Sequence, residues 1–221
     1  YTLWHTLSLH DALPISLGVV IMYANILLDE VEEESQYHED LKLIVEQAER
    51  CKGIVGGLLN FARKNQVNYK ETDLNELVRI SLSSVIVPEN VQVEVASEMQ
   101  HPYAEIDQEQ MIQVVSNLIK NAIEAMPGGG KLKIELKESE NHHRIYITDS
   151  GTGINESDLQ KVFEPFFTTK GIGKGTGLGL ATAYGVVKMH KGKIDVDSNS
   201  DPSQGDTFTK FKIKLPKRRP L

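Results

Sequence analysis

The apolar residues of this chain follow two different periods, and the change between them limits which folds are open to it. From Leu17 to about Asn65 they recur at alternating spacings of three and four residues, which is the period of packed helices. From Val91 onward they recur at every second residue in several short runs, as in strands with one buried face. The chain is therefore expected to be an α+β protein, with a helical segment followed by an α/β sandwich.

Two helices are expected in residues 17–66. Their apolar positions are Leu17, Val20, Ala24, Leu27 and Val31, then Leu41, Ile44, Ala48, Cys51, Val55, Leu58 and Ala62. The acidic stretch Asp29–Asp40 separates the two series, and the turn is placed near Glu34 and Ser35. Such a hairpin leaves half of its apolar stripe exposed, so we predict a homodimer in which two hairpins form a four-helix bundle. The alternative is a hairpin that packs only against its own domain.

Residues 67–72 are expected to be a linker, and residues 73–221 a second domain. Strands are expected near Val91–Val95, Leu132–Leu136, Ile145–Ile147 and Phe211–Leu215, and helices near Asp73–Ser84, Asp107–Ala125, Glu156–Val162 and Leu178–His190. This alternation predicts one mixed sheet with helices on one face.

Charge and cysteine content narrow the function classes. A net charge of -7 argues against nucleic acid as a partner, because phosphate binding needs a basic face. The single cysteine, Cys51, allows no internal disulfide and fits a reducing compartment, so a cytoplasmic location is expected. The apolar run Leu17–Leu28 is interrupted by Asn25 and is too short to span a bilayer, so no membrane contact is expected within this sequence, although a longer protein could be tethered.

Residues 1–16 are expected to be a non-native tail. The stretch from Thr6 to Ile15 has no clear apolar period and carries Pro14. It also matches a common short-read sequencing adapter, ACT CTT TCC CTA CAC GAC GCT CTT CCG ATC, codon for codon. Our hypothesis is that adapter sequence was read in frame here. Uninterrupted genomic reads through Tyr1 would contradict it.

Asn117 and Asn121 lie four residues apart in a predicted helix and therefore share one face. Carboxamide oxygens can ligate Mg²⁺ without adding charge beside a triphosphate. Leu118, Ala122 and Ala125 place this helix in a core, so the two asparagines suggest the wall of a pocket. Two solvated asparagines are the simpler alternative.

Asp149 ends a predicted strand and opens the sequence Asp-Ser-Gly-Thr-Gly-Ile. A carboxylate at a strand end can accept a hydrogen bond from an exocyclic amine, as on adenine. Gly151 and Gly153 would let the backbone approach a flat base closely. An ordinary turn is the alternative.

Two further motifs follow. In Phe163–Lys170, aromatic residues precede hydroxyls and a lysine that can reach a phosphate. In Gly171–Leu180, glycine N–H groups and the start of a predicted helix suit a polyphosphate. This second motif lacks the Gly-Lys-Ser/Thr ending of a Walker A loop. A core aromatic pair and a flexible linker are the alternatives.

In this order, the four motifs resemble the N, G1, F and G2 boxes of the sensor histidine kinases of two-component systems, nearest to the nitrogen-regulation type. The resemblance covers about Leu17 to Pro216, with Arg50–Arg63 similar to the second helix of the dimerisation and phosphotransfer domain. It implies a Bergerat ATP-binding fold that uses ATP and Mg²⁺. It also implies phosphoryl transfer to a histidine and then to an aspartate on the receiver domain of a response regulator.

The resemblance also assigns roles to individual residues. It implies that Asn121 ligates Mg²⁺, that Asn117 lies by the phosphates as a catalytic residue, and that Asp149 binds the adenine amine. Thr207 would lie near adenine. The remaining implied ATP-binding residues are Gly151, Gly153, Ile154, Phe167, Thr168, Thr169, Lys170, Lys174, Gly175, Thr176, Gly177, Leu178 and Gly179.

The chain departs from this family at the phosphoacceptor. The family box, His-Glu/Asp-x-x-Asn-Pro-Leu-Gly, would end at Leu17-Gly18 and would place its histidine where this chain has Asp11. His10 is one residue out of register and lies in the adapter-like segment. We therefore expect the native phosphoacceptor to be missing, with His10 serving only if that segment is native. The other histidines are expected to be solvated or structural, including His38, His142, His143 and His190.

Three other functions remain open. An ATPase of the related gyrase and chaperone class would have a glutamate as general base where this chain has Asn117. An anti-sigma-type serine kinase would not need the helical hairpin. A non-enzymatic module that dimerises under the control of ATP would need neither a general base nor a phosphoacceptor.

Overall fold

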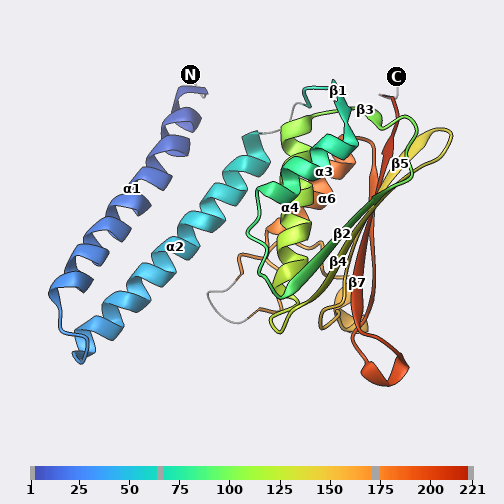
Figure 1. Ribbon diagram of the computed structural model, residues 1–221. Coiled ribbons are helices and arrows are strands. Elements are labelled where there is room, and N and C mark those ends of the chain that lie inside the picture. The colour runs from blue at the N-terminus through green and yellow to red at the C-terminus, as the bar shows by residue number, and fades with distance from the viewer. Residues whose placement is uncertain (1–2, 64–66, 171–174, 219–221) are drawn as a thin grey trace. The chain divides into compact units, whose positions relative to one another are not determined.

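The computed structural model divides into two compact units, Tyr1–Asn65 with Phe166–Leu178, and Gln66–Pro165 with Gly179–Leu221 (Figure 1). It describes residues 3–63, 67–170 and 175–218, and the side chains of residues 16–49, 51–52, 67–170 and 175–218.

The first unit contains a helical hairpin of α1 (Leu3–Glu30) and α2 (Gln36–Arg63). Ser35 closes the turn between them, because its backbone N–H donates to the Glu32 carbonyl (2.9 Å) and its hydroxyl accepts from the Tyr37 N–H (3.3 Å). The predicted hairpin and its turn are confirmed.

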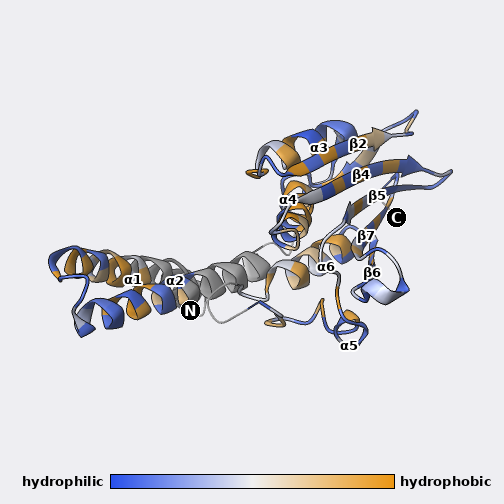
Figure 2. Cartoon of the chain, turned by 60° about the horizontal axis from the view of Figure 1, so that its bottom comes forward, coloured by the Kyte–Doolittle hydropathy of each residue, from blue (hydrophilic) through white to orange (hydrophobic). Residues whose placement is uncertain are grey.

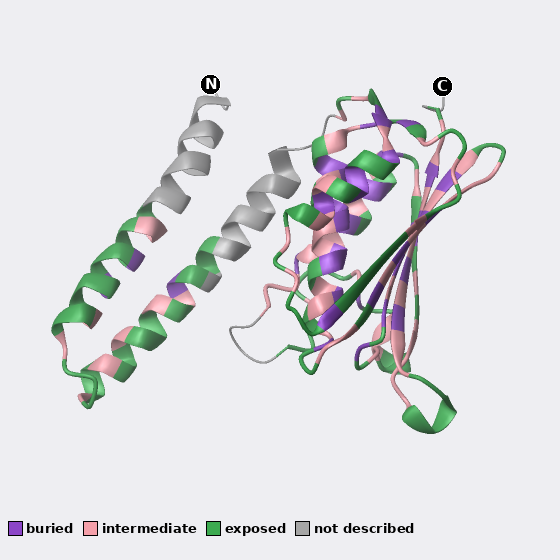
Figure 3. Ribbon diagram, viewed as in Figure 1, coloured by how far each residue is buried: buried purple, intermediate pink, exposed green. Residues whose placement is uncertain are grey.

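Burial in the hairpin follows part of the predicted heptad. Among the described side chains of the hairpin, the buried apolar residues are Ile21, Ala24 and Ala48, and the last two are predicted heptad positions. Many other large apolar side chains of the hairpin remain exposed (Figures 2 and 3), namely Val19, Val20, Met22, Tyr23, Ile26, Leu27, Leu43 and Ile44. Within the described residues, no helix is long and apolar enough to cross a membrane.

The backbone of α1 runs from Leu3 through Pro14, so the segment suspected of being a sequencing adapter is part of this helix. That residues 1–16 are a non-native tail stays a prediction.

The second unit is built on a five-stranded sheet in the order β2-β4-β5-β7-β6. Its strands are β2 (Val91–Ser97), β4 (Gly130–Glu138), β5 (His142–Asp149), β6 (Lys193–Asn199) and β7 (Phe208–Pro216). β2 runs parallel to β4, and the other neighbours are antiparallel. Three helices, α3 (Leu74–Ser83), α4 (Gln108–Glu124) and α6 (Gly179–Met189), cover one face of this sheet (Figure 1). The predicted mixed sheet with helices on one face is confirmed.

Several elements differ from the expectation. A separate antiparallel pair, β1 (Lys70–Asp73) with β3 (Tyr103–Ile106), was not predicted, and β1 occupies part of the expected linker 67–72. β6 and a short 3₁₀ helix at Pro202–Gln204 were also not predicted. The helix α5 (Glu156–Leu159) ends before Val162 because the chain turns there and buries the Val162 side chain.

Alternation along the strands builds the core. Every second residue of β5 and β7 is buried, including Ile145, Ile147 and Ile213, and these pack with apolar residues of the helices such as Leu118 and Val187. The opposite face carries charged side chains. This pattern, with one buried face, is what an α/β sandwich requires.

The helices begin at residues that the sequence marks as caps. The Asp73 carboxylate accepts from the Asn75 N–H at the start of α3 (2.8 Å), and the Asp107 carboxylate accepts from the Gln110 N–H at the start of α4 (3.1 Å). These contacts satisfy backbone donors that have no partner inside the helix.

A buried histidine ties α4 to α6. The backbone N–H of Asp107 donates to His190 Nε2 (3.0 Å), so the other ring nitrogen, Nδ1, carries the proton and donates to the Val186 carbonyl (2.8 Å). Burial lowers the pKa of His190. The expectation of a structural histidine is met here.

The first described residues of the second unit are hydrogen-bonded to the same region, where α4 begins and α6 ends. The backbone N–H of Asn68 donates to Asp107 Oδ2 (3.1 Å), and the Tyr69 hydroxyl donates to the Met189 carbonyl (3.1 Å). The Tyr69 and His190 rings meet in a T-shaped arrangement, with centroids 5.8 Å apart.

Candidate functional site

Asp149 ends β5 with its carboxylate buried, since only 2% of the residue is exposed. The backbone N–H of Gly151 donates to this carboxylate (2.9 Å to Oδ1), and the backbone of Thr209 and of Asp149 itself also favours its charged form. Burial raises the pKa of Asp149 to about 6, and these backbone groups oppose that rise. A buried carboxylate with a raised pKa at a strand end is a feature of binding sites.

The turn after Asp149 has no room for side chains at its two glycines. A Cβ atom on Gly151 would lie 2.6 Å from the Ala125 carbonyl oxygen. Gly153 adopts a positive φ of 71°, and a Cβ there would lie 2.1 Å from the Asn199 carbonyl oxygen. The Thr152 N–H donates to the same Ala125 carbonyl (3.1 Å), so the turn is held against the end of α4.

The turn ends at Ile154, whose N–H donates to the Ser198 hydroxyl of β6 (2.8 Å). In the β5–β7 register, the residue opposite Asp149 is Thr209, which is buried. Thr207, which the sequence placed near adenine, precedes β7 and is partly exposed. Sequence reasoning missed both Thr209 and Ser198, because their nearness to Asp149 depends on strand register.

Asn117 lies on the face of α4 that meets the start of α6. A Cβ on Gly179 would lie 2.5 Å from Asn117 Oδ1 and 2.9 Å from Nδ2, so only glycine leaves this amide undisturbed. Asn117 Nδ2 is buried without a hydrogen-bond partner in the described part of the chain. Because a buried amide without a partner is costly, this donor is available for a ligand.

Asn121 lies one helical turn further along α4 and is partly exposed. The described residues include no group of three or more His, Cys, Asp or Glu side chains able to hold a metal ion. A cation bound beside Asn121 would have the amide oxygen of this residue, water and the phosphates of a nucleotide as ligands. This donor set fits Mg²⁺, which usually keeps several waters and binds with substrate phosphates.

The segment Phe166–Leu178 belongs to the first unit, and its two ends are joined. The Phe166 N–H donates to the Gly177 carbonyl (3.0 Å), and a Cβ on Gly177 would lie 2.4 Å from the Phe166 carbonyl carbon. The Thr168 hydroxyl accepts from the Lys170 N–H (3.2 Å), and the Thr176 hydroxyl accepts from the Leu178 N–H (3.4 Å).

This segment carries several predicted ATP-binding residues: Phe167, Thr168, Thr169, Lys170, Gly175, Thr176, Gly177 and Leu178. Lys174 lies outside the described residues. The ATP-binding role of this segment stays a prediction.

The two buried histidines of the second unit, His143 and His190, bond backbone groups away from Asp149. His143 is buried, its Nε2 lies 2.9 Å from the Tyr103 carbonyl oxygen, and burial lowers its pKa. His190 is bonded to backbone at both nitrogens. The side chain of His10 lies outside the described residues, so its role stays a prediction.

The comparisons with known proteins agree with this arrangement. The family described as "Histidine kinase-, DNA gyrase B-, and HSP90-like ATPase" matches residues 106–219. Sporulation kinase A of Bacillus subtilis (strain 168) is 35% identical over 196 residues, which cover 87% of this chain and 31% of that protein. Sensor histidine kinase ZraS of Escherichia coli (strain K12) is 34% identical over 175 residues, which cover 78% of this chain and 37% of that protein. The chain thus spans about a third of the length of these relatives.

The fold of this chain is also similar to solved structures of histidine kinases. The catalytic domain of histidine kinase ThkA matches with a TM-score of 0.60 and 31% identity, covering 69% of this chain and 97% of that one. ThkA in complex with the response regulator protein TrrA matches with a TM-score of 0.67 and 25% identity, covering 96% of this chain and 61% of that one.

Proposed function

Because this chain belongs to the histidine kinase-, DNA gyrase B-, and HSP90-like ATPase family, and within it to the two-component sensor histidine kinases, we propose that it is an ATP-dependent protein-histidine kinase core. It would pass the γ-phosphoryl group of ATP to a histidine and from there to an aspartate of a response regulator. The observation that carries this proposal is the buried Asp149 carboxylate, held beside a glycine turn that packs on the helix of Asn117 and Asn121.

Each residue has a role in this proposal. The Asp149 carboxylate accepts a hydrogen bond from the 6-amino group of adenine, and the glycines of the turn leave room for the flat base. The free Asn117 amide lies by the phosphates, and Asn121 would hold Mg²⁺. Held there, the ion would supply charge neutralisation to the phosphoryl group. The chain itself contributes mainly positioning of the nucleotide.

The partners follow from the hairpin. Its exposed apolar side chains support a homodimer with a four-helix bundle, because a second copy would cover them. A receiver domain is proposed as the phosphoryl acceptor, in line with the complex of ThkA with its response regulator. The proposed site of action is cytoplasmic.

The expected lack of a phosphoacceptor leads to two alternatives. Without a usable histidine, this chain would act only on a partner that carries one, or would use ATP to control dimerisation. Hydrolysis as the main activity is disfavoured, because Asn117 stands where a water-activating glutamate would be needed.

The test is incubation with radiolabelled Mg·ATP, followed by a check of whether the label is lost in acid and kept in base. Three proteins are compared: this chain, its His10→Ala variant, and a version whose residues 11–18 carry the full phosphoacceptor box. We expect acid-labile label only on the restored version. Label on this chain that His10→Ala abolishes would instead make His10 the phosphoacceptor. No label on any folded protein would favour the non-kinase alternative.

We expect ATP affinity to fall as the pH drops through about 6, the value to which burial raises the pKa of Asp149. Protonation removes the acceptor that the adenine amine needs, so Kd should rise by up to roughly tenfold per pH unit below that value. Calorimetric titration between pH 5 and pH 8 measures this. The Asp149→Asn variant corrects for titration of the nucleotide, and a profile identical in both proteins would contradict the prediction.

We expect Gly179→Ala to impair phosphoryl transfer without unfolding the protein. The new methyl group would meet the end of the Asn117 side chain, which can move aside at small cost to stability. Displacing a catalytic amide by about 1 Å can cost around 100-fold in rate, so we expect a loss of at least 10-fold in labelling rate when the substitution is made in the version with the restored phosphoacceptor box. Gly128→Ala is the control, because a Cβ there has no atom within 4 Å. Equal rates in the two variants would refute the role of Asn117.

A further inference from the structure

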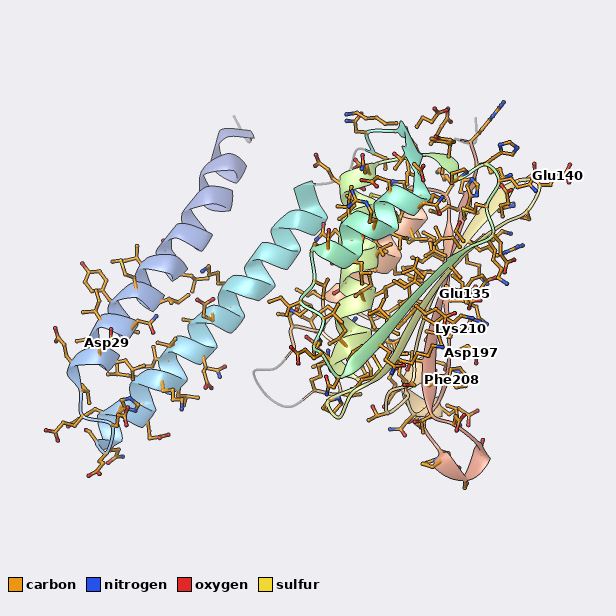
Figure 4. The ribbon with its side chains drawn as sticks, viewed as in Figure 1. Asp29, Glu135, Glu140, Asp197, Phe208 and Lys210 are labelled. Atoms are coloured by element: carbon orange, nitrogen blue, oxygen red, sulfur yellow. The ribbon has the colours of Figure 1, made fainter. Side chains whose placement is uncertain are left out.

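Ser198, near the end of β6, lies in a row of residues that crosses three strands to Asp149. Ser198 pairs with Thr209 of β7, and Thr209 pairs with Asp149 of β5. The Ser198 hydroxyl lies 2.8 Å from the Ile154 nitrogen, 2.5 Å from the Phe208 carbonyl oxygen and 3.1 Å from the Thr209 hydroxyl. Figure 4 labels Phe208, at the start of β7.

The directions of these hydrogen bonds can be assigned. A serine hydroxyl has one proton to donate and two lone pairs to accept with. The Phe208 carbonyl can only accept, so it receives the Ser198 proton, and the Ile154 N–H donates to Ser198. The remaining lone pair therefore accepts from the Thr209 hydroxyl. All hydrogen-bonding positions of Ser198 are used within the protein.

These contacts fix the far end of the glycine turn. The turn begins where the Asp149 carboxylate accepts from Gly151, and it ends where Ile154 donates to Ser198. Thr209 lies between the two anchors, because it is paired with Asp149 in the β5–β7 register and its hydroxyl donates to Ser198. Loss of the Ser198 hydroxyl would leave the Ile154 N–H and the Phe208 carbonyl without this partner.

We propose that Ser198 is a positioning residue that sets the orientation of the Asp149 carboxylate and thereby the preference of the site for adenine over guanine. This proposal rests on the proposed ATP-binding function. A fixed carboxylate favours the 6-amino group of adenine, which donates, and disfavours the 6-carbonyl group of guanine, which only accepts. A turn that can shift allows the carboxylate to move away, and the discrimination decreases.

The test compares Ser198→Thr with Ser198→Val, two variants of the same shape that differ only in the hydroxyl. Kd values for ATP and GTP are measured by calorimetry on the full chain, together with Tm. We expect Ser198→Thr to keep the wild-type ratio of GTP Kd to ATP Kd within about threefold. We expect Ser198→Val and Ser198→Ala to bind ATP roughly 5- to 30-fold more weakly, with a change in GTP Kd of less than about twofold.

The control is Ser139→Ala, because Ser139 also donates to a backbone carbonyl, that of His142, at the other end of β5. An unchanged ratio of GTP Kd to ATP Kd in Ser198→Val would overturn the proposal, whether both affinities are kept or both fall equally. If the wild-type chain binds neither nucleotide, the proposed function fails and this inference fails with it. Normal wild-type binding with an unchanged variant ratio contradicts the inference alone.

Discussion

Asp149→Asn should weaken ATP binding by roughly 10- to 150-fold, the value of one hydrogen bond to a charged group. The carboxylate accepts a hydrogen bond from the Gly151 N–H, and its remaining acceptor capacity is what we assign to the adenine amine. An asparagine offers one oxygen and turns an NH₂ group toward donors, so it cannot replace this arrangement. Kd for ATP, measured at pH 7.5 with excess Mg²⁺, checks the expectation.

The same variant should alter the pH dependence of stability. The pKa of Asp149 is raised from 3.8 to about 6 on folding. The stabilisation that comes from its protonated form is therefore complete below about pH 3.8 and is lost as the pH rises through about 6. At about 1.4 kcal/mol per unit, the ionised group costs the nucleotide-free protein about 3 kcal/mol at neutral pH. Between pH 4 and pH 7, the free energy of unfolding of the wild type should therefore fall by up to this amount relative to that of Asp149→Asn. Denaturant unfolding measures this difference.

Asp195→Asn is the matched control, because Asp195 is exposed on β6 and pairs only with the exposed Lys193 in the described residues. It should leave both ATP affinity and the pH dependence unchanged. Retention of wild-type ATP affinity by Asp149→Asn would remove Asp149 from the binding site.

Asn121→Ala should reduce the rate of phosphoryl transfer by at least about 100-fold in the version with a restored phosphoacceptor box. Loss of a metal-binding oxygen removes transition-state charge neutralisation that is worth several kcal/mol. The diagnostic measurement is ATP Kd with Mg²⁺ and with EDTA. Mg²⁺ should strengthen binding to the wild type, while the variant should show nearly equal values under the two conditions.

Asn141→Ala serves as its control, since Asn141 is an exposed asparagine in the β4–β5 hairpin. Its backbone carbonyl accepts a hydrogen bond from the Lys217 N–H, and the substitution leaves this bond in place. A full Mg²⁺ response in Asn121→Ala would assign the metal to other residues.

Local sequence signals predicted the elements that are stabilised locally. The helix α4 was expected from Asp107 to Ala125, and these residues are its two caps, because the Asp107 carboxylate bonds an N–H only three residues away. The strands of the sheet centre were visible because alternate residues such as Ile145 and Ile147 are buried. The fold class followed from these signals together.

The elements that were missed depend on distant pairing. β1 is Lys-Glu-Thr-Asp, with only Thr72 buried, and it forms by pairing with β3. β6 has two apolar residues, Ile194 and Val196, and is a strand because β7 lies beside it. Thr209 could not be connected with Asp149 from sequence, because only the β5–β7 register brings them together.

The attachment of Asn68 and Tyr69 determines where mechanical load enters the second unit. These residues directly follow the boundary at Gln66, and their bonds lead to Asp107 at the start of α4 and to Met189 at the end of α6. His190 joins the same two helix ends. A force applied to the chain at this boundary would therefore act first on α4 and α6, the two helices that carry Asn117 and Gly179, and only then on the sheet.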